Sequence, residues 1–147
     1  MMKIEFNNGE YRVTADPNQI DVQWVHAFLA ESYWAKNVPL EVVKISIKNS
    51  LAFGLFKGDE PAGFGRAVTD RATFAYLADI FVDEAHRGRG LGKWLIQCIF
   101  DHPDLYNLRR WMLITEDAHG LYENFGFKVI STPGKFMEIK NHGVYDS

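Results

Sequence analysis

The sequence predicts an α/β (α+β) fold in a single domain, residues 1–147, with a mixed, mostly antiparallel sheet flanked by helices. Two apolar runs, 51–57 and 62–69, flank a turn at 58–61 that contains glycine and proline, which indicates an antiparallel hairpin. A third apolar run, 73–82, leads through a glycine-rich loop into an amphipathic helix. A chain of 147 residues suits one hydrophobic core.

The N-terminal third is expected to contribute a strand and two helices. Residues 10–15 alternate in polarity and predict the opening strand. Asp21 is a candidate helix N-cap, and Pro39 suits the first turn of a second helix that ends near residue 49. Apolar residues recur at helical spacing in both: Val22, Val25, Phe28 and Leu29 in the first, and Leu40, Val43 and Ile47 in the second.

The C-terminal third is expected to complete the sheet. Residues 110–115 read R-W-M-L-I-T, which is typical of a buried strand. Residues 117–125 predict a short helix closed by Gly126, because glycine accepts the left-handed conformation that ends many helices. Two last strands are predicted at 127–131 and 135–140.

Composition excludes several classes of protein. The chain is 47% hydrophobic and 24% charged, as in ordinary soluble proteins, and it shows neither a membrane-length apolar run nor a signal-peptide pattern. The net charge of −3 argues against nucleic-acid binding, and we also expect no membrane partner. Cys98 is the only cysteine, so a cytoplasmic location is expected. The histidines lack metal-ligand spacing, so no metal is predicted.

The loop before the long amphipathic helix has the features of an anion site. Glycines allow the backbone to approach a ligand, and the first N–H groups of a helix have no partner within it. The helix dipole adds about half a positive charge at that end. The loop residues in question are Arg87, Gly88, Arg89, Gly90, Leu91, Gly92 and Lys93. A phosphate-bearing ligand is therefore expected, although a tight connection that binds nothing is the alternative for the loop alone.

Two common phosphate-binding patterns fail. The pattern G-x-x-x-x-G-K-[ST] fails because residue 87 is arginine and Trp94 follows the lysine. The dinucleotide pattern G-x-G-x-x-G would need glycine where Lys93 stands. A third pattern, R-x-x-G-x-G, is matched in full by Arg87, Gly90 and Gly92.

This third pattern resembles that of the GNAT superfamily of N-acetyltransferases. Residues 122–127, Y-E-N-F-G-F, match the family's later Y-x-x-x-G-F signature, and Ala118 and Leu121 fall on its A-x-x-L-Y spacing. The resemblance implies that strands 73–82 and 110–115 are a parallel pair that splays apart around the pantetheine arm of acetyl-CoA. It also implies that the loop residues bind the pyrophosphate, and it makes a homodimer one expected assembly.

The implied reaction moves an acetyl group from acetyl-CoA directly to a primary amine of a small molecule or peptide. The backbone of Phe81 and Val82 would contact pantetheine. Thr115 stands where many members carry an asparagine that contacts the cosubstrate. In this chain the Thr115 hydroxyl or His119 would make that contact instead. The alternative function is a domain that binds acetyl-CoA as a sensor or interaction module without turnover.

Tyr122 is the candidate acid that protonates the departing thiolate. A phenol of pKa about 10 can protonate the thiolate of a thiol of pKa about 8.5, because the local environment can offset so small a difference between the two pKa values. The alternative is a core aromatic residue.

Asp79 is the candidate for the acceptor side, because a carboxylate within an apolar strand needs a partner. It would take a proton from the amine or hold a cationic substrate. An ion pair with Arg66 is an equally good interpretation. By the family resemblance, Tyr33 and Trp34 would frame the acceptor pocket.

Overall fold

The computed structural model describes residues 4–146 and contains one six-stranded sheet in sequence order. The strands are β1 (Glu5–Asn8), β2 (Tyr11–Thr14), β3 (Leu51–Lys57), β4 (Glu60–Thr69), β5 (Phe74–Val82) and β6 (Arg110–Met112). Neighbouring strands from β1 to β5 are antiparallel, and β5 and β6 are parallel. The predicted mixed, mostly antiparallel sheet is confirmed.

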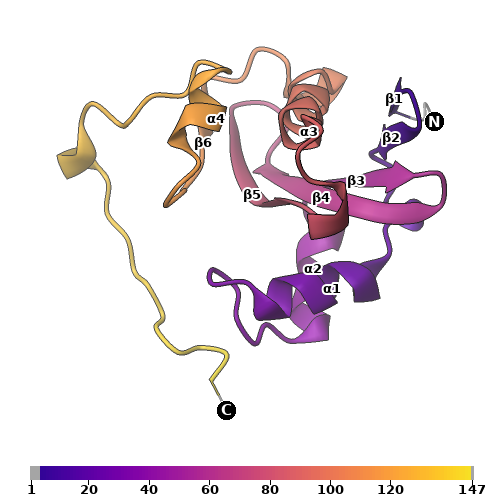
Figure 1. The fold of residues 1–147 in the computed structure, drawn as a ribbon. Coiled ribbons are helices and arrows are strands. Elements are labelled where there is room, and N and C mark those ends of the chain that lie inside the picture. Colours follow the sequence, from indigo (N-terminus) through magenta and orange to yellow (C-terminus); the bar gives the residue numbers. More distant parts are fainter. Residues whose placement is uncertain (1–3, 147) are drawn as a thin grey trace.

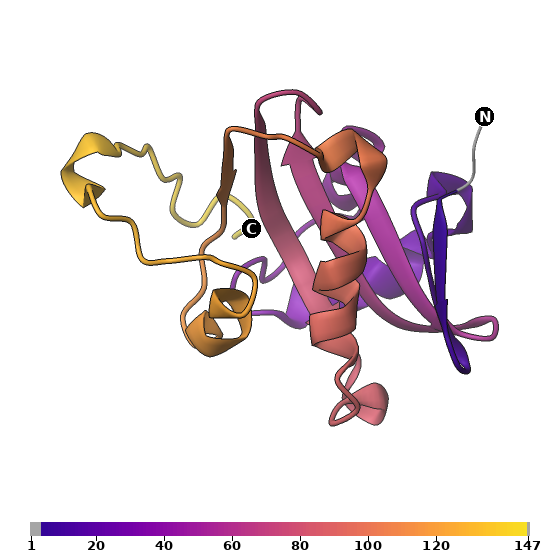
Figure 2. The ribbon, with the colours of Figure 1, turned by 90° about the horizontal axis from the view of Figure 1, so that it is seen from above.

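Helices cover both faces of this sheet (Figures 1 and 2). They are α1 (Val22–Glu31), α2 (Leu40–Lys48), α3 (Leu91–Phe100) and α4 (His119–Glu123), with 3-10 turns at Pro17–Gln19, Glu84–His86, Pro103–Leu105 and Pro133–Lys135. The Asp21 carboxylate accepts a hydrogen bond from the Trp24 N–H at 3.1 Å and so caps α1 as predicted. Pro39 immediately precedes α2, also as predicted. No helix of the described residues is long and apolar enough to cross a membrane.

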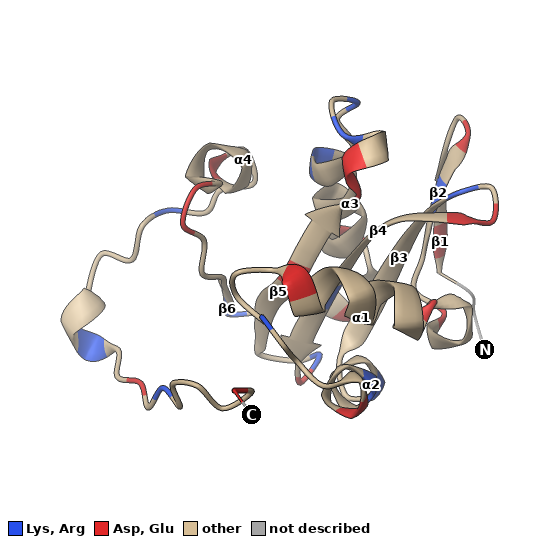
Figure 3. Cartoon of the chain, turned by 60° about the horizontal axis from the view of Figure 1, so that its bottom comes forward, with Lys and Arg blue, Asp and Glu red and all other residues tan. Residues whose placement is uncertain are grey.

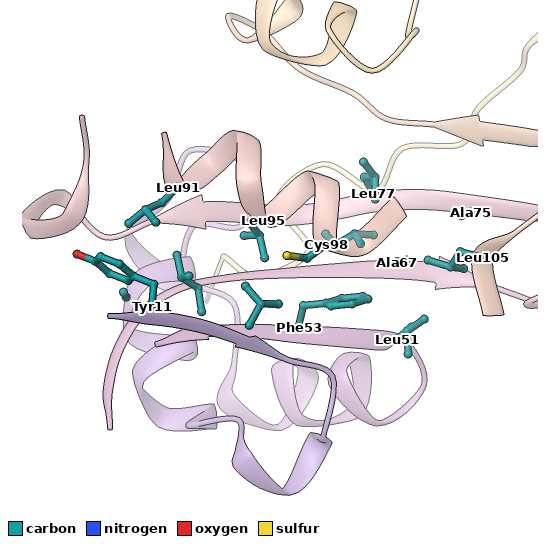
Figure 4. Packing of buried hydrophobic residues seen from close by; sticks show 14 residues of the cluster. Tyr11, Leu51, Phe53, Ala67, Ala75, Leu77, Leu91, Leu95, Cys98 and Leu105 are labelled. Atoms are coloured by element: carbon teal, nitrogen blue, oxygen red, sulfur yellow. The ribbon is translucent and has the colours of Figure 1, made fainter. Parts of the chain in front are cut away.

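Each face of the sheet has its own hydrophobic cluster. One cluster joins α3 to the inner strands through Leu95, Phe53 and Leu77 (Figure 4). The other joins α1 and α2 to the opposite face, where Phe64 and Phe81 are buried. The two helical layers are therefore fixed to the sheet independently, and β5 takes part in both clusters.

Replacing Leu95 by alanine is expected to lower the free energy of unfolding by about 3 kcal/mol, because it leaves a cavity under α3. The Leu95 side chain is 0% exposed. Ile45→Ala, at an exposed position of α2, is the matched control and should change stability by less than about 0.5 kcal/mol. Urea unfolding followed by tryptophan fluorescence measures both. Equal losses of unfolding free energy in the two variants would mean that packing under α3 does not stabilise the fold.

The parallel strands pair over only three residues. Phe74 lies opposite Arg110 and Tyr76 lies opposite Met112, and beyond that point no pairing continues although β5 extends to Val82. The predicted splay of the central parallel pair is therefore present. The strand predicted at 110–115 is correspondingly shorter, because its second half has no partner on β5.

Several sequence predictions for the ends of the chain are wrong. Residues 127–131 and 135–140, predicted as strands, do not form strands in the described part of the chain, because neither segment is paired with the sheet. The helix predicted at 117–125 is confined to α4. The sequence analysis also missed β1, whose polar residues carry little strand signal; it forms because it pairs with β2.

The last part of the chain, residues 128–146, forms what we call the C-terminal arm. It leaves the body after α4 and makes a wide excursion before it returns below the sheet (Figures 1 and 2). The Arg110 guanidinium lies 5.5 Å from the centre of the Phe136 ring, and Tyr145 packs against the cluster under α1 and α2. The arm thus touches the body at two separated points.

Candidate active site

A cleft of about 950 Å³ opens where β5 and β6 part. Its walls come from the α1–α2 connection, the second half of β5, the segment after β6, and the end of the C-terminal arm. Predicted site residues that line it are Tyr33, Trp34, Asp79, Phe81, Val82, Arg87, Thr115 and Tyr122. The fold therefore brings residues from four separate stretches of the sequence to one cavity.

A β-bulge at Asp79 shapes this cleft. Phe64 pairs with Phe81 while Arg66 pairs with Ala78, so β5 contains one residue more than β4 across this interval. Asp79 takes up the irregularity with a φ of 56°, a left-handed conformation that aspartate adopts more readily than most residues. The bulge lies just beyond the last β5–β6 pair and turns the Asp79 side chain toward the α1–α2 connection. The sequence analysis did not predict it.

Both oxygens of the Asp79 carboxylate accept hydrogen bonds. Arg66 Nε donates to Oδ2 at 2.7 Å, and Trp34 Nε1 donates to Oδ1 at 2.8 Å. The Asp79 and Arg66 side chains are only 10% and 18% exposed, so water screens this ion pair less than one on the surface. The ion pair with Arg66 is thus present, and the carboxylate also ties the α1–α2 connection to the sheet.

Aromatic rings form the wall on the α1 side. Phe28 of α1 stacks on Phe81 with ring centres 3.7 Å apart and planes 5° from parallel. Tyr33 and Trp34 meet edge to face at 5.1 Å, yet both keep large exposed surfaces. The Phe28–Phe81 stack is rigid support, whereas Tyr33 and Trp34 remain free to contact a ligand. Sequence analysis missed Phe28, because its helical spacing indicated only a core position.

Tyr122 lies across the cleft, on α4. The side chain is half-buried and packs edge to face against Phe127 at 5.9 Å. Burial raises the pKa of the Tyr122 phenol above its ordinary value, and the nearby Tyr33 hydroxyl adds a smaller effect in the same direction. Tyr122 therefore keeps its proton at neutral pH, as a general acid must.

The glycine-rich loop continues from one end of the cleft. Gly88 and Gly90 have φ values of 80° and 74°, and Gly90 directly precedes α3. No side chain caps α3, so its first backbone N–H groups point out of the helix without an acceptor within it. The basic residues of this loop gather at the same end (Figure 3). Arg87, Arg89 and Lys93 are exposed, whereas Leu91 is buried and offers a ligand only its backbone.

One exposed and one buried contact hold the loop in place. Arg87 Nε donates to the Val82 carbonyl at 2.9 Å. His86, which is buried, lies 2.9 Å from the Tyr11 hydroxyl through Nδ1. These contacts fasten the loop to β5 and β2 and therefore fix its position relative to the cleft. Sequence analysis missed the His86–Tyr11 pair, since nothing local links residues so far apart in the chain.

Of the other predicted contact residues, Thr115 belongs to the cleft wall and His119 does not. Thr115 lines it and accepts the Ala118 N–H through Oγ1 at 3.0 Å, which stabilises the turn into α4. His119 is exposed and does not belong to the cleft wall. Cys98 is buried, and burial raises the pKa of its thiol to about 12, so it is a core residue rather than a nucleophile. Residues 4–146 contain no cluster of three or more groups suited to holding a metal ion.

Comparison with known proteins decides the family. The model of the acetyltransferase (GNAT) family matches residues 18–127 of this chain. The chain belongs to the GNAT family of acetyltransferases. Its matched region runs from the 3-10 turn before α1 through the second signature at Phe127 and ends immediately before the C-terminal arm.

Three similar proteins illustrate how this GNAT protein compares with known sequences and structures. A protein of Gibberella zeae named as a candidate acetyltransferase is 29% identical over 84% of this chain and 82% of its own. A crystal structure of a candidate GNAT acetyltransferase from Xanthomonas campestris superposes with a TM-score of 0.90 at 42% identity, covering 93% of this chain and 97% of the other. The spermine/spermidine N(1)-acetyltransferase of Bacillus subtilis is 35% identical over 52% of this chain and 49% of its own.

Proposed function

We propose that this GNAT protein transfers an acetyl group from acetyl-CoA directly to a primary amine of a small molecule or peptide. The observation that carries the proposal is the continuity of the site. The cleft runs from Arg87, where the glycine-rich loop begins, past the unpaired part of β5 to Asp79 and Tyr122. A phosphate-bearing thioester and an amine would thus meet in one cavity.

The cosubstrate fits the groups that the fold leaves unpaired. The loop offers helix N–H groups and three basic side chains to a pyrophosphate. Past Tyr76, β5 has no strand on its β6 side, so backbone groups near Phe81 and Val82, other than the Val82 carbonyl that accepts from Arg87, are open to an extended, amide-containing pantetheine arm. Binding would resemble the addition of one more strand to an exposed sheet edge.

The chemical step divides between two sides of the cleft. The amine loses a proton before its nitrogen attacks the acetyl carbon, and unpaired N–H groups near the Asp79 bulge would stabilise the negative charge on the carbonyl oxygen. As the new C–N bond forms, the C–S bond breaks, and the Tyr122 phenol supplies the proton that the departing sulfur needs. The acceptor arrives as an ammonium, and its first proton passes to solvent, directly or by way of the Asp79 carboxylate, before the attack. The second proton leaves the nitrogen after the C–N bond has formed, and it replaces, through solvent, the proton that Tyr122 gave to the sulfur.

A cationic acceptor is favoured by the acids at the cleft. Four carboxylates line it, from Asp79, Glu116, Asp117 and Asp146, together with four basic side chains, from Lys36, Arg66, Arg87 and Lys140. Arg66 is paired with Asp79 and Arg87 begins the glycine-rich loop, so Glu116, Asp117 and Asp146 are the acids that could attract an amine. An amine that carries further positive charges, as polyamines do, would gain attraction from them. The relative named as a spermine/spermidine acetyltransferase supports the same class.

The activity is tested by following CoA thiol release from acetyl-CoA against a panel of acceptors. Spermidine and a monoamine differ in the number of positive charges, a lysine peptide tests a peptide amine, and an alcohol of matched size tests whether the acceptor atom must be nitrogen. We expect release with amines and none with the alcohol, with the acetylated amine identified by mass. Acetyl-CoA binding without release for any amine would instead support the sensor or interaction module.

Gly92→Ala is expected to weaken acetyl-CoA binding about tenfold, or about 1.4 kcal/mol, with no loss of stability. A Cβ at Gly92 would meet only a Val82 methyl at 3.9 Å, which is ordinary contact, so the fold accepts alanine. The methyl group would instead obstruct the approach of a phosphate to the first turn of α3. Calorimetric titration measures the affinity, with Gly134→Ala in the arm as the control. An unchanged affinity for acetyl-CoA would show that the loop does not contact the cosubstrate.

A further inference from the structure

Two polar side chains beside Asp79 have no role in the acetyl transfer described above. Arg66 of β4 pairs with Ala78 of β5, and Tyr76 lies two residues before Ala78. Because side chains two apart on a strand share a face, and paired residues face the same way, the Arg66 and Tyr76 side chains emerge on one face of the sheet. Both line the cleft together with Asp79.

The Arg66 guanidinium is held on two sides and open on the third. Nε donates to Asp79 Oδ2 at 2.7 Å, and Nη1 donates to Ser50 Oγ at 3.1 Å. A guanidinium has five N–H donors, so these two bonds leave three. Within residues 4–146, Nη2 makes no hydrogen bond, and no fully buried side-chain nitrogen or oxygen lacks a partner. Nη2 is therefore accessible, and its N–H groups are available in the cleft.

The Tyr76 hydroxyl offers a second donor at the same place. It donates no hydrogen bond within the described part of the chain, although the side chain is half-buried. Burial raises the pKa of the Tyr76 phenol, the Asp79 carboxylate adds to the rise, and the Arg66 guanidinium opposes it. The hydroxyl therefore lies near both charges and keeps its proton at neutral pH.

We propose that Arg66 and Tyr76 bind a carboxylate of the acceptor, and that the acceptor is an α-amino acid whose amine lies at Asp79. The identity of the acceptor rests on the proposed acetyl transfer. Because Arg66 and Asp79 are in contact, the two groups that they attract must also be close together. An α-amino acid carries its ammonium and its carboxylate on one carbon atom, so each charge can lie against its opposite. Arginine suits this role, since its planar fork matches carboxylate geometry.

The other charges of the cleft favour an amino acid with a basic side chain. Glu116 and Asp117 belong to the wall formed by the segment after β6, apart from the Arg66–Asp79 pair. They remain available for a positive group at the far end of the acceptor, such as the side-chain ammonium of lysine or ornithine. A polyamine has positive groups for these acids but no carboxylate for Arg66. We therefore expect lysine to be preferred to cadaverine, which is lysine without its carboxylate.

The test is calorimetric titration of the full-length chain, with and without CoA, using lysine, cadaverine and lysinamide. Lysinamide replaces the carboxylate by an uncharged group of similar size. Lysine should bind about tenfold more tightly than the other two, as expected for hydrogen bonds to a charged group. Tyr76→Phe should remove most of this preference, because it deletes one donor to the carboxylate. Tyr106→Phe, which removes an exposed phenol outside the cleft, is the matched control and should keep the preference.

Three results would overturn the proposal. They are no measurable binding of lysine, an affinity for cadaverine or lysinamide equal to that for lysine, and a preference for lysine that Tyr76→Phe leaves intact. These affinities need no turnover. A preference for lysine without any CoA release would therefore refute acetyl transfer and leave the carboxylate site in place.

The product gives a second readout where transfer occurs. Proton NMR of acetylated lysine should show the acetyl group on the α-amine, because that amine is adjacent to the carboxylate held by Arg66. Acetylation of the side-chain amine alone would contradict the placement of the α-amine at Asp79. Cadaverine has no carboxylate for Arg66, so its kinetics report on Asp79 separately.

Discussion

Tyr122→Phe is expected to lower kcat for amine acetylation by about a hundredfold or more, within the range of a lost general acid. The substitution removes only the hydroxyl, while the ring contact with Phe127 and the hydrophobic packing remain. Acetyl-CoA affinity should stay near that of the unmodified enzyme. Steady-state kinetics with a saturating amine, together with calorimetric titration, measures both quantities.

Tyr33→Phe is the matched control for Tyr122, because it removes a phenol from the opposite wall of the cleft. It should change KM for the amine more than kcat. The pKa of Tyr122 is raised by burial, so ionisation of the phenol should cause no loss of rate between pH 7 and about 9, and at pH about 10, where an ordinary tyrosine is half ionised, less than half of it should be lost. Full turnover by Tyr122→Phe would show that the thiolate leaves without help from this residue.

Asp79→Asn is expected to lower both stability and activity. The change leaves Arg66 with a positive charge that has lost its counterion and is only partly solvated. We expect a loss of about 2 kcal/mol, below the roughly 3–5 kcal/mol of a fully buried pair, because both side chains keep some exposure. Asparagine is chosen because it also adopts a positive φ and can still accept from Trp34. Urea unfolding and kcat/KM for the amine measure the two effects.

The double variant Arg66→Met/Asp79→Asn separates structure from catalysis. It removes both charges, so most of the lost stability should return. If Asp79 receives the proton of the amine or holds its charge, kcat/KM should remain at least tenfold low, a difference of about 1.4 kcal/mol. Recovery of activity together with stability would show that Asp79 serves only as an ion-pair partner.

Much of the fold follows from local signals in the sequence. The Asp21 cap, Pro39 before α2, the turn between β3 and β4 and the glycines before α3 each act within a few residues. The order of strand, loop and helix could therefore be predicted. The parallel pairing of β5 with β6 was an implication of the family resemblance, which the structure confirms.

The features that could not be predicted from the sequence depend on residues that lie far apart in the chain. The bulge at Asp79 arises from the pairing of β4 with β5, and the Trp34 bond to Asp79 needs the α1–α2 connection folded over the sheet. The segments predicted as the last two strands have the right composition but pair with no strand among residues 4–146.

The most direct test of the central claim is a comparison of thermal shifts with acetyl-CoA, free CoA, ATP and NAD. A ligand at 100 times its Kd should stabilise the protein by about 2.7 kcal/mol. We predict that acetyl-CoA and CoA raise Tm while ATP and NAD leave it unchanged. No rise with acetyl-CoA at millimolar concentration would contradict acetyl transfer and leave the loop from Arg87 to Lys93 as a connection without a ligand.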